Sequence, residues 1–286
     1  MKTHTNVDFT DNFMFTHVMR NPKVCAAFLE CLLPWLKIDR IEYVDAKGAI
    51  KPEVEKTLEY ARDRHGVRLD AYVDDGKSVY NIEMQATKKA AQPQRARFNQ
   101  SHLDLNQLER STDYEQLRPS YVIFICKHDP FGKGYYQYSF EDVCQEDPSL
   151  KLNDGAYKVF FNAAGTVGTI RDKLKDLLQY INDAEAFPTE ETENPLIQEI
   201  DKLVEEANHD AEWRRAYMMY QLQLQDERKQ GRAEGRLEGL TEGELKGKLK
   251  GKLEAALAML QDQVPSSQIA RYTGLPVSEI EALERV

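Results

Sequence analysis

The segment 66–85 constrains the fold of this chain more than any other part of its sequence. It reads GVRLDAYVDDGKSVYNIEMQ and places Asp75-Gly76 between two runs in which apolar and polar side chains alternate. An Asp-Gly pair between alternating runs is the strongest short-range signal for a β-hairpin with a two-residue loop. With that loop, residues that face each other have numbers that sum to 151, and the apolar pairs are Val67–Met84, Leu69–Ile82 and Ala71–Tyr80.

This register sorts the side chains of the hairpin into two chemically different faces. The apolar face collects Val67, Leu69, Ala71, Val73, Tyr80, Ile82 and Met84. The other face collects Arg68, Asp70, Tyr72, Asn81, Glu83 and Gln85. Because side chains in a strand alternate with a period of two, a slip of one residue would reverse every one of them. The clean segregation on both strands therefore supports the register.

The polar face of the hairpin combines residues that suit a divalent cation. Asp70 is expected opposite Asn81, so Glu83 lies diagonally across from it, at about 7–8 Å between side chains. Mg²⁺ prefers hard oxygen ligands and is typically held by one or two carboxylates, water and substrate phosphate. Such an ion lowers the pKa of bound water and neutralises charge on a phosphoryl oxygen. Gln85 projects from the same face and could orient the attacking water.

The rest of the chain predicts an α/β domain followed by a helical tail. The expected helices are two within 12–36, broken at Asn21-Pro22, one at 92–110 and one at 168–181. The expected strands are 39–46, 120–127, 135–140 and 156–161. Pro188 and Pro195 mark a linker at 182–195, so the expected domains are residues 1–181 and a helical tail at 196–286.

These residues resemble a known family. The order Asp70, turn, Glu83-x-Gln85 looks like the PD-(D/E)XK nuclease signature, and its Glu-x-Gln form is similar to the Rpn family of recombination-promoting nucleases and transposases. Three further stretches match the pattern of that family in order: DFTDNFMFTHVM (8–19), QRARFNQSHLDLNQL (94–108) and YVIFICKHDPFG (121–132). The resemblance covers about residues 8–180 and also the style of the tail.

The resemblance implies a restriction-endonuclease-like αβββαβ core and Mg²⁺-dependent DNA cleavage, with Mn²⁺ as a substitute ion. Asp70 and Glu83 would be metal ligands, Gln85 would stand at the usual Lys position, and Asp11 would add a further acidic contact. Leu69 occupies the Pro position of the signature, and Met14 stands where the opening helix of the family has Lys.

The uncharged Gln85 creates a chemical requirement of its own. Charge that develops in the transition state must be met by metal or by another cation, for which Lys88, Arg95 and Arg97 are the candidates. The same three residues are the expected DNA contacts.

Each of these assignments has a plainer alternative. Asp70 and Glu83 also fit the solvated face of an edge hairpin. Arg95 and Arg97 also fit capping or pairing on an exposed helix, and Asp11 fits a helix N-terminus, where the macrodipole favours negative charge.

Charge is distributed unevenly along the 286 residues. Residues 1–180 hold 25 basic and 26 acidic side chains, a net charge of −1, whereas residues 181–286 hold 13 and 22, a net charge of −9. Acidity therefore lowers the expectation of non-specific DNA binding by the tail but leaves the first domain free to hold a phosphodiester.

Compartment and membrane association can also be judged from the sequence. The longest apolar run, Tyr121–Cys126, is too short to span a bilayer, and the N-terminus carries Asp8 and Asp11 without an apolar stretch. The four cysteines show no paired spacing. These features predict a soluble cytoplasmic protein with reduced thiols.

The tail contains glycine at every fourth position from 231 to 251. Each glycine costs a helix about 1 kcal/mol relative to alanine, which favours a frayed helical spacer over a close-packed self-association helix or low-complexity sequence without function. The end of the tail shows two short helical patterns around Gly274. Its second helix carries Glu279, Glu281 and Glu284 against a single Arg285, so it fits a packing or dimerisation unit better than a DNA reader.

Two hypotheses of different classes follow. The leading one is a metal-dependent DNA endonuclease of the PD-(D/E)XK transposase type. The alternative is a catalytically idle relative that associates with other proteins through its helical tail. A homodimer through the C-terminal helices is compatible with both, because cutting two strands usually needs two sites.

Overall fold

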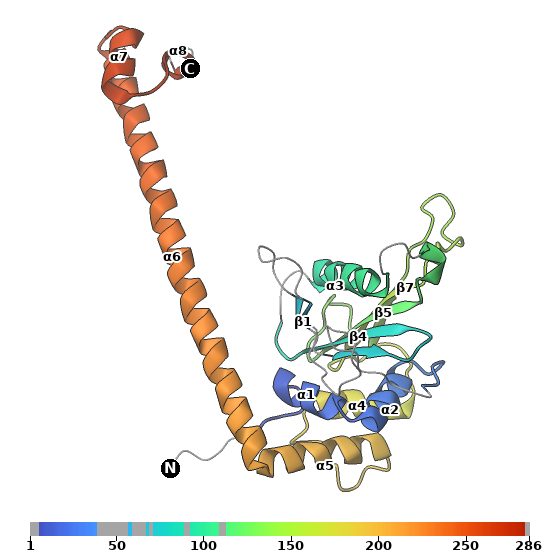
Figure 1. The fold of residues 1–286 in the computed structure, drawn as a ribbon. Helices are drawn as coiled ribbons and strands as arrows, with labels where there is room; N and C mark the ends of the chain where they lie inside the picture. The colour runs from blue at the N-terminus through green and yellow to red at the C-terminus, as the bar shows by residue number, and fades with distance from the viewer. Residues whose placement is uncertain are drawn as a thin grey trace. The chain divides into compact units, whose positions relative to one another are not determined.

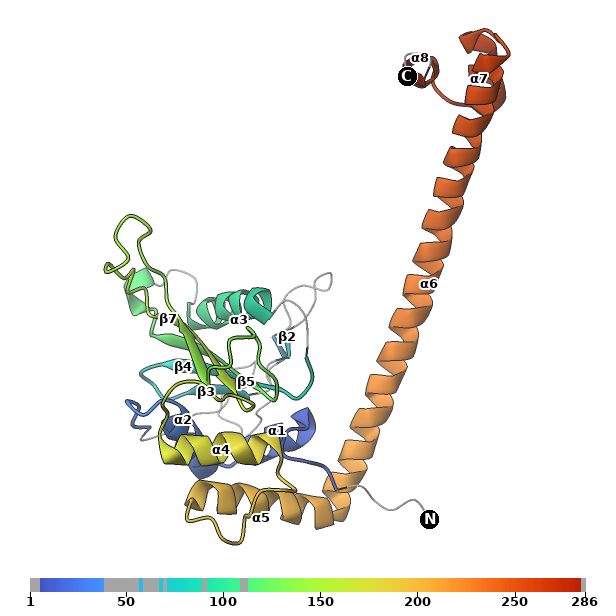
Figure 2. The ribbon, with the colours of Figure 1, turned by 180° about the vertical axis from the view of Figure 1, so that it is seen from behind.

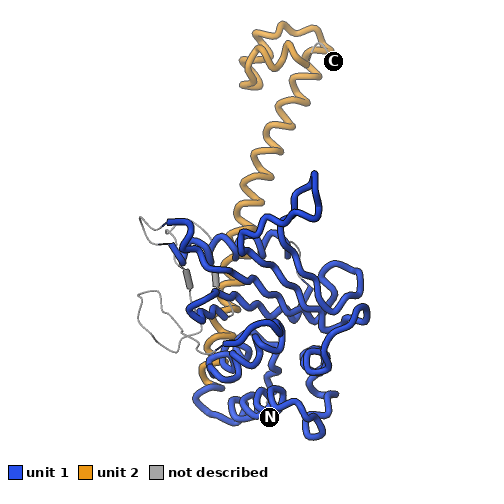
Figure 3. Tube along the Cα trace, turned by 90° about the vertical axis from the view of Figure 1, so that its right-hand side faces the viewer, with its two compact units in different colours: residues 1–214 blue, residues 215–286 orange. Residues whose placement is uncertain are grey.

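The chain forms two compact units, residues 1–214 and residues 215–286 (Figure 3). This computed structural model describes residues 6–38, 57–58, 67–68, 71–88, 92–108 and 113–283. The strand expected at 39–46 lies outside the described residues, and so do Leu69 and Asp70.

The first unit is built on a five-stranded mixed sheet (Figure 1). The strand order is β3 (Ala71–Asp74), β4 (Val79–Gln85), β5 (Ser120–Cys126), β7 (Ala156–Asn162) and β6 (Gln137–Phe140). The three central strands β4, β5 and β7 are parallel, and the two edge strands pair antiparallel to their neighbours. Two-residue strands β1 (Thr57–Leu58) and β2 (Val67–Arg68) form a separate antiparallel pair. The predicted α/β class is confirmed.

The hairpin of β3 and β4 is real, but its register differs from the predicted one by two residues. Ala71 pairs with Ile82 and Asp74 with Val79, so the paired numbers sum to 153 rather than 151. The predicted pairings of Ala71 with Tyr80, of Leu69 with Ile82 and of Asp70 with Asn81 are therefore wrong, because Ile82 pairs with Ala71 and Asn81 pairs with Tyr72. The loop contains four residues, 75–78, because the Asp75 carboxylate accepts hydrogen bonds from the backbone N–H groups of Lys77 and Ser78.

The pairing predicted between Val67 and Met84 is also wrong. Val67 belongs to β2 and pairs with Leu58 of β1. Because a shift of two residues preserves the alternation of side chains, Ala71, Val73, Tyr80, Ile82 and Met84 still share one face of the β3–β4 hairpin, and Tyr72, Asn81, Glu83 and Gln85 share the other.

Helices cover both faces of the sheet (Figures 1 and 2). Helix α3 (Gln92–Gln107) covers one face, and α1 (Asn12–Met19), α2 (Pro22–Leu32), α4 (Asp172–Asn182) and α5 (Pro195–His209) lie on the other side. All seven residues of β4 are buried. The polar hairpin face is thus not a solvated surface, because Tyr72 and Val79 pack with Ala96 and Leu103 of α3 in one hydrophobic cluster.

Most of the predicted helices and strands are found close to their expected bounds. The break between the first two helices falls at Asn21-Pro22, where the Asn21 side chain accepts from the N–H groups of Lys23 and Val24 and caps α2. Helix α4 begins at Asp172, four residues later than predicted. Here Gly165 and Gly168 precede the helix, and Gly168 has a positive φ of 94°, which is incompatible with a right-handed helix.

Helix α5 packs in the first unit, although the sequence predicts that the tail begins at residue 196. Its Leu196, Ile197 and Ile200 are buried, and it contacts α1 and α2. The Asn208 side chain accepts from the backbone N–H of Val7 at 2.8 Å and donates to its carbonyl at 3.0 Å. The residues from 182 to 194 therefore connect two parts of one compact unit.

The second unit consists mainly of one long helix. Helix α6 (Ala211–Gln261) runs through all six glycines of the repeat, and no other atom lies within 4 Å of the position that a Cβ would take on any of them. At its end, α7 (Ser266–Thr273) and α8 (Val277–Leu283) form a small cluster with Ala256. Gly274 ends α7 with a φ of 68°, the left-handed conformation that glycine adopts without strain.

No helix in the part of the chain that the structure describes is long and apolar enough to cross a membrane.

The packing of α5 predicts how the chain responds to truncation. Each fully buried Leu or Ile contributes about 1.5–3 kcal/mol. Removing α5 therefore costs a large part of the stability of a typical domain, about 5–15 kcal/mol. We expect a chain that ends at Arg214 to unfold cooperatively in urea and a chain that ends at Glu193 to lose this transition. Equal urea midpoints for the two chains would place the domain boundary at 182–195 instead.

Candidate active site

Strand β4 places Glu83 and Gln85 side by side on the face that α3 covers. Both side chains are buried, each with 1% of its surface exposed. Their partners on the neighbouring parallel strand β5 are Phe124 and Cys126. The sequence predicts that these two polar residues share a face, and the structure confirms it. The cover that helix α3 provides over this face arises only in the tertiary structure.

Arg95, in the first turn of α3, joins the two side chains. Its Nη2 lies 3.1 Å from Glu83 Oε2, and its Nη1 donates to Gln85 Oε1 at 2.9 Å. The guanidinium also lies over the ring of Phe124, 5.7 Å from the ring centroid. About a third of the Arg95 side chain remains exposed. A buried carboxylate is thus compensated by one cation that reaches the surface.

Three amide side chains complete the network. Glu83 Oε1 accepts from Asn99 Nδ2 at 3.2 Å and from Asn81 Nδ2 at 3.4 Å, and Gln92 Nε2 donates to Gln85 Oε1 at 3.4 Å. Gln92 and Asn99 were not singled out from the sequence. Gln92 precedes Arg95 by three residues and Asn99 follows it by four, so the three side chains lie on one face of a helix. This spacing is the sequence pattern that could have identified them.

The oxygen atoms of this network suit a hard divalent cation. Besides the Glu83 carboxylate, Asn81 Oδ1 and Gln92 Oε1 are buried and have no hydrogen-bond partner within the described residues. Carboxylate and amide carbonyl oxygens are the ligands that Mg²⁺ accepts. Within the described ranges no group of three or more His, Cys, Asp or Glu side chains forms a metal cluster.

The remaining predicted site residues have varied surroundings. Asp70, which directly precedes β3, lies outside the described residues. Asp11 caps α1, where its Oδ1 accepts from the N–H groups of Phe13 and Met14, as the plainer alternative for this residue predicts. Lys88, three residues beyond β4, and Arg97 on α3 are exposed.

The segment after β5 borders the end of β4 and adds residues that sequence reasoning missed. The backbone N–H of Lys127 donates to the carbonyl of Gln85 at 3.1 Å, and Lys127 Nζ lies 3.9 Å from Asp8 Oδ2. Both ring nitrogens of the next residue, His128, are buried without a partner among the described residues. Burial and the nearby Lys88 lower the pKa of His128, so its ring is neutral near pH 7.

The thiol of Cys126 shares the sheet face with Gln85. Burial raises the pKa of this thiol to about 12, an effect that the nearby Arg95 only partly offsets. Cys126 is therefore protonated and packs as a small apolar residue rather than acting as a thiolate ligand.

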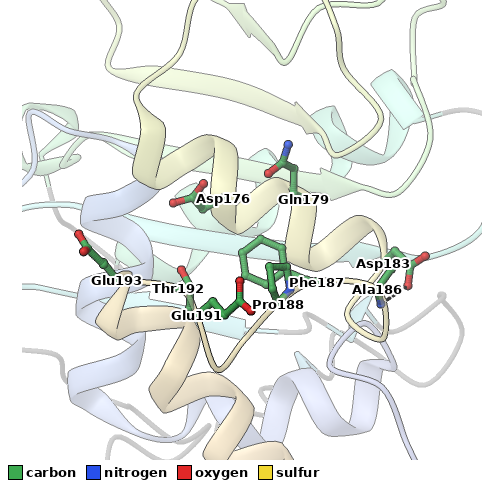
Figure 4. Close-up of a pocket in the computed structure, with 9 residues that line it drawn as sticks. All are labelled: Asp176, Gln179, Asp183, Ala186, Phe187, Pro188, Glu191, Thr192 and Glu193. Atoms are coloured by element: carbon green, nitrogen blue, oxygen red, sulfur yellow. Dashed lines mark hydrogen bonds between the residues drawn. The ribbon is translucent and has the colours of Figure 1, made fainter.

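A depression between α4 and α5 has the wrong charge for a phosphodiester. This cavity of about 550 Å³ lies between α4 and the segment before α5 (Figure 4). Its lining includes four carboxylates and no Lys or Arg: Asp176, Gln179, Asp183, Ala186, Phe187, Pro188, Glu191, Thr192 and Glu193. These carboxylates would repel a polyanion, so this cavity does not suit a phosphodiester.

A mixed sheet that carries a buried Glu-x-Gln on a central strand, with a basic helix above it, defines a nuclease-like α/β fold. Comparison with known families agrees: the model of the PD-(D/E)XK nuclease family transposases matches residues 5–233. The chain belongs to this family, as its resemblance to the signature predicts. No curated protein and no solved structure matches the chain.

The ion pair at the centre of the site can be tested by a double-mutant cycle. Removing one partner of a buried ion pair costs about 3–5 kcal/mol. Because Arg95 is partly exposed, we expect Arg95→Ala to lower the free energy of unfolding by about 2 kcal/mol. The double variant Arg95→Ala/Glu83→Gln should lose less than the two single variants together, because no uncompensated charge remains.

Urea unfolding at pH 7 measures these differences. Arg97→Ala, an exposed arginine on the same helix, is the matched control and should change stability by less than about 0.5 kcal/mol. Strictly additive losses in the cycle would show that Arg95 and Glu83 do not interact.

Proposed function

We propose that this chain is a metal-dependent DNA endonuclease that hydrolyses phosphodiester bonds. Its family supports a function of the nuclease or transposase type and DNA as the substrate. The observation that carries the proposal is the buried group of Glu83, Gln85 and Arg95. Burying the Glu83 carboxylate costs free energy, whereas an apolar side chain would fill the same position on the central strand without that cost. The presence of a carboxylate there therefore favours a role in chemistry.

In this proposal Glu83 and Asp70 hold Mg²⁺, for which Mn²⁺ can substitute. Asp70 is the natural second ligand because it directly precedes Ala71, whose partner Ile82 is next to Glu83. When bound, the ion would lower the pKa of a water molecule and offset negative charge on the phosphate. Asp11 is a less favoured third ligand, since its Oδ1 already caps α1.

Gln85 and Arg95 together replace the lysine of the usual signature. The Gln85 carbonyl oxygen accepts from Arg95 and from Gln92. The group that Gln85 offers to a water or phosphate is therefore its amide NH₂, which orients by donation and cannot accept a proton. Arg95 supplies the positive charge that Gln85 lacks, because its cationic guanidinium contacts Gln85 and is partly exposed.

The exposed cations near the site suit the DNA backbone. Lys88 and Arg97 are exposed, and neither takes part in the hydrogen bonds of Glu83 and Gln85 described above. Contacts of this kind position a duplex without reading its sequence. Arg95 differs from them because two of its N–H groups are already used inside the site.

One observation favours the alternative of a catalytically idle protein. Arg95 already forms an ion pair with Glu83, the carboxylate that is proposed to hold the metal. A permanently bound guanidinium can replace a metal ion as the counter-charge. The protein would then act by association through its helical tail.

Supercoiled plasmid, incubated with the purified protein and Mg²⁺, Mn²⁺ or EDTA, separates the two functions. We expect nicking or linearisation with either metal, none with EDTA, and none from Asp70→Ala or Glu83→Ala. Glu205→Ala, which removes an exposed carboxylate of α5, is the matched control and should cut like the wild type. Circular dichroism confirms that each variant is folded. A folded wild type that cuts with neither metal would support the idle alternative.

The two arginines of α3 should affect cleavage differently. Arg95→Ala should lower the cleavage rate at saturating DNA by about 100-fold, because it removes a preorganised cation from the reacting groups. Arg97→Ala should leave that rate unchanged but weaken DNA binding. It should also reduce the slope of log Kd against log salt concentration by about 1, because one phosphate contact is lost. Single-turnover cleavage and fluorescence anisotropy over a range of salt measure the two effects. Equal behaviour of both variants would remove Arg95 from the site.

A further inference from the structure

Charge along helix α6 is segregated into two adjacent blocks of opposite sign. Residues 238–244 contain three glutamates and no Lys or Arg, a net charge of −3, and residues 246–252 contain four lysines and no Asp or Glu, a net charge of +4. Every residue in both blocks is exposed, and Leu249 keeps 49% of its surface exposed.

One face of the helix combines these charges with apolar side chains. At 3.6 residues per turn, Leu245 shares a face with Thr241 and Leu249. The same face carries Glu238 and Glu242 before the leucines and Lys248 and Lys252 after them. Leu245 is 64% exposed. Further along the helix, Ala256 is covered by α7 and α8, so the uncovered face ends near residue 252.

We propose that this face, defined by Glu238, Thr241, Glu242, Leu245, Lys248, Leu249 and Lys252, binds the same face of a second copy of the chain in antiparallel orientation. A two-fold axis at Leu245 pairs residues whose numbers sum to 490. Glu242 then meets Lys248 of the second copy, Glu238 meets Lys252, and the two Leu245 side chains meet each other. A parallel pair would bring like charges together, so the charge pattern selects the antiparallel one.

The ion pairs within the helix do not compete strongly with this association. Lys246 lies 2.6 Å from Glu242 and Lys250 lies 3.8 Å from Glu254 in the same chain. Solvent-exposed pairs of this kind contribute little to stability, so Glu242 can accept a partner from a second copy at little cost.

A partner also answers the instability of the helix itself. Each of the six glycines disfavours a helix relative to alanine, and no side chain or neighbouring element lies within 4 Å of the position that a Cβ would take on any of them. At the height of Leu245 the nearest glycines, Gly243 and Gly247, lie about 160° around the helix from it, so they are not part of the proposed face. Helices that pack through side chains spaced four residues apart cross at about −50°. Such a crossing limits the contact to a few turns, which matches the length of the proposed face.

Sedimentation velocity of the full-length chain over a wide range of concentration tests the association. We expect a concentration-dependent dimer. The variants Glu238→Lys/Glu242→Lys and Lys248→Glu/Lys252→Glu should each weaken it by about tenfold or more, because like charges then face each other. The chain that carries all four reversals should dimerise again. Failure of that chain to dimerise, or a monomeric wild type at every concentration, would overturn the proposal.

Cysteine cross-linking tests the orientation, since the tail has no cysteine of its own. Leu245→Cys should form a disulfide-linked dimer under mild oxidation, because the two-fold axis places both copies of this residue together. Leu237→Cys, which is also exposed, should not cross-link with itself. Cross-linking of Leu237→Cys as strongly as Leu245→Cys would indicate a parallel pair and contradict the antiparallel one.

Glycine replacement provides the matched control. Gly243→Ala/Gly247→Ala should raise the helical content seen by circular dichroism and leave the dimer intact. Loss of the dimer in this variant would assign the interface to the glycine face and refute the one proposed. None of these measurements depends on cleavage of DNA, so they stand apart from the test of the endonuclease.

Discussion

The compensation of the Glu83 carboxylate by Arg95 is the interaction on which the rest of the first unit depends. A charged group with 1% of its surface exposed is tolerated only where hydrogen bonds and an opposite charge surround it. That requirement fixes α3 over the sheet, because Arg95 and Asn99 must reach Glu83 from the same helix. The packing of Ala96 and Leu103 against the sheet then follows from the same placement.

The same arrangement explains how the site differs from the usual PD-(D/E)XK pattern. The signature supplies a cation on the strand itself, whereas here the strand carries a neutral glutamine and the cation comes from the covering helix. A guanidinium reaches two acceptors at once, so it can orient Glu83 and Gln85 together. A charge placed on α3 also remains partly exposed, which a lysine at a fully buried strand position would not.

The two compact units follow different physical rules. The first unit is held by burial on both faces of a parallel-centred sheet, as α/β folds require. Trp213 in the first turn of α6 packs against Phe13 and His17 of α1, residues 225–252 are exposed, and the last turns share a hydrophobic cluster with α7 and α8. The dimer proposed above would cover the exposed face of this helix, which is rich in glycine and in segregated charge.

The sequence by itself determined the alternation that puts Glu83 and Gln85 on one face, the break at Asn21-Pro22, and the central strand at 120–127, because these depend on local spacing and capping. It also pointed to the family through four motifs in order. Only the tertiary structure decided the hairpin register, which the Asp75 carboxylate shifts by two residues, and the burial of the polar face under α3. The role of Arg95 and the docking of α5 depend on contacts between segments far apart in the chain, which no local pattern encodes.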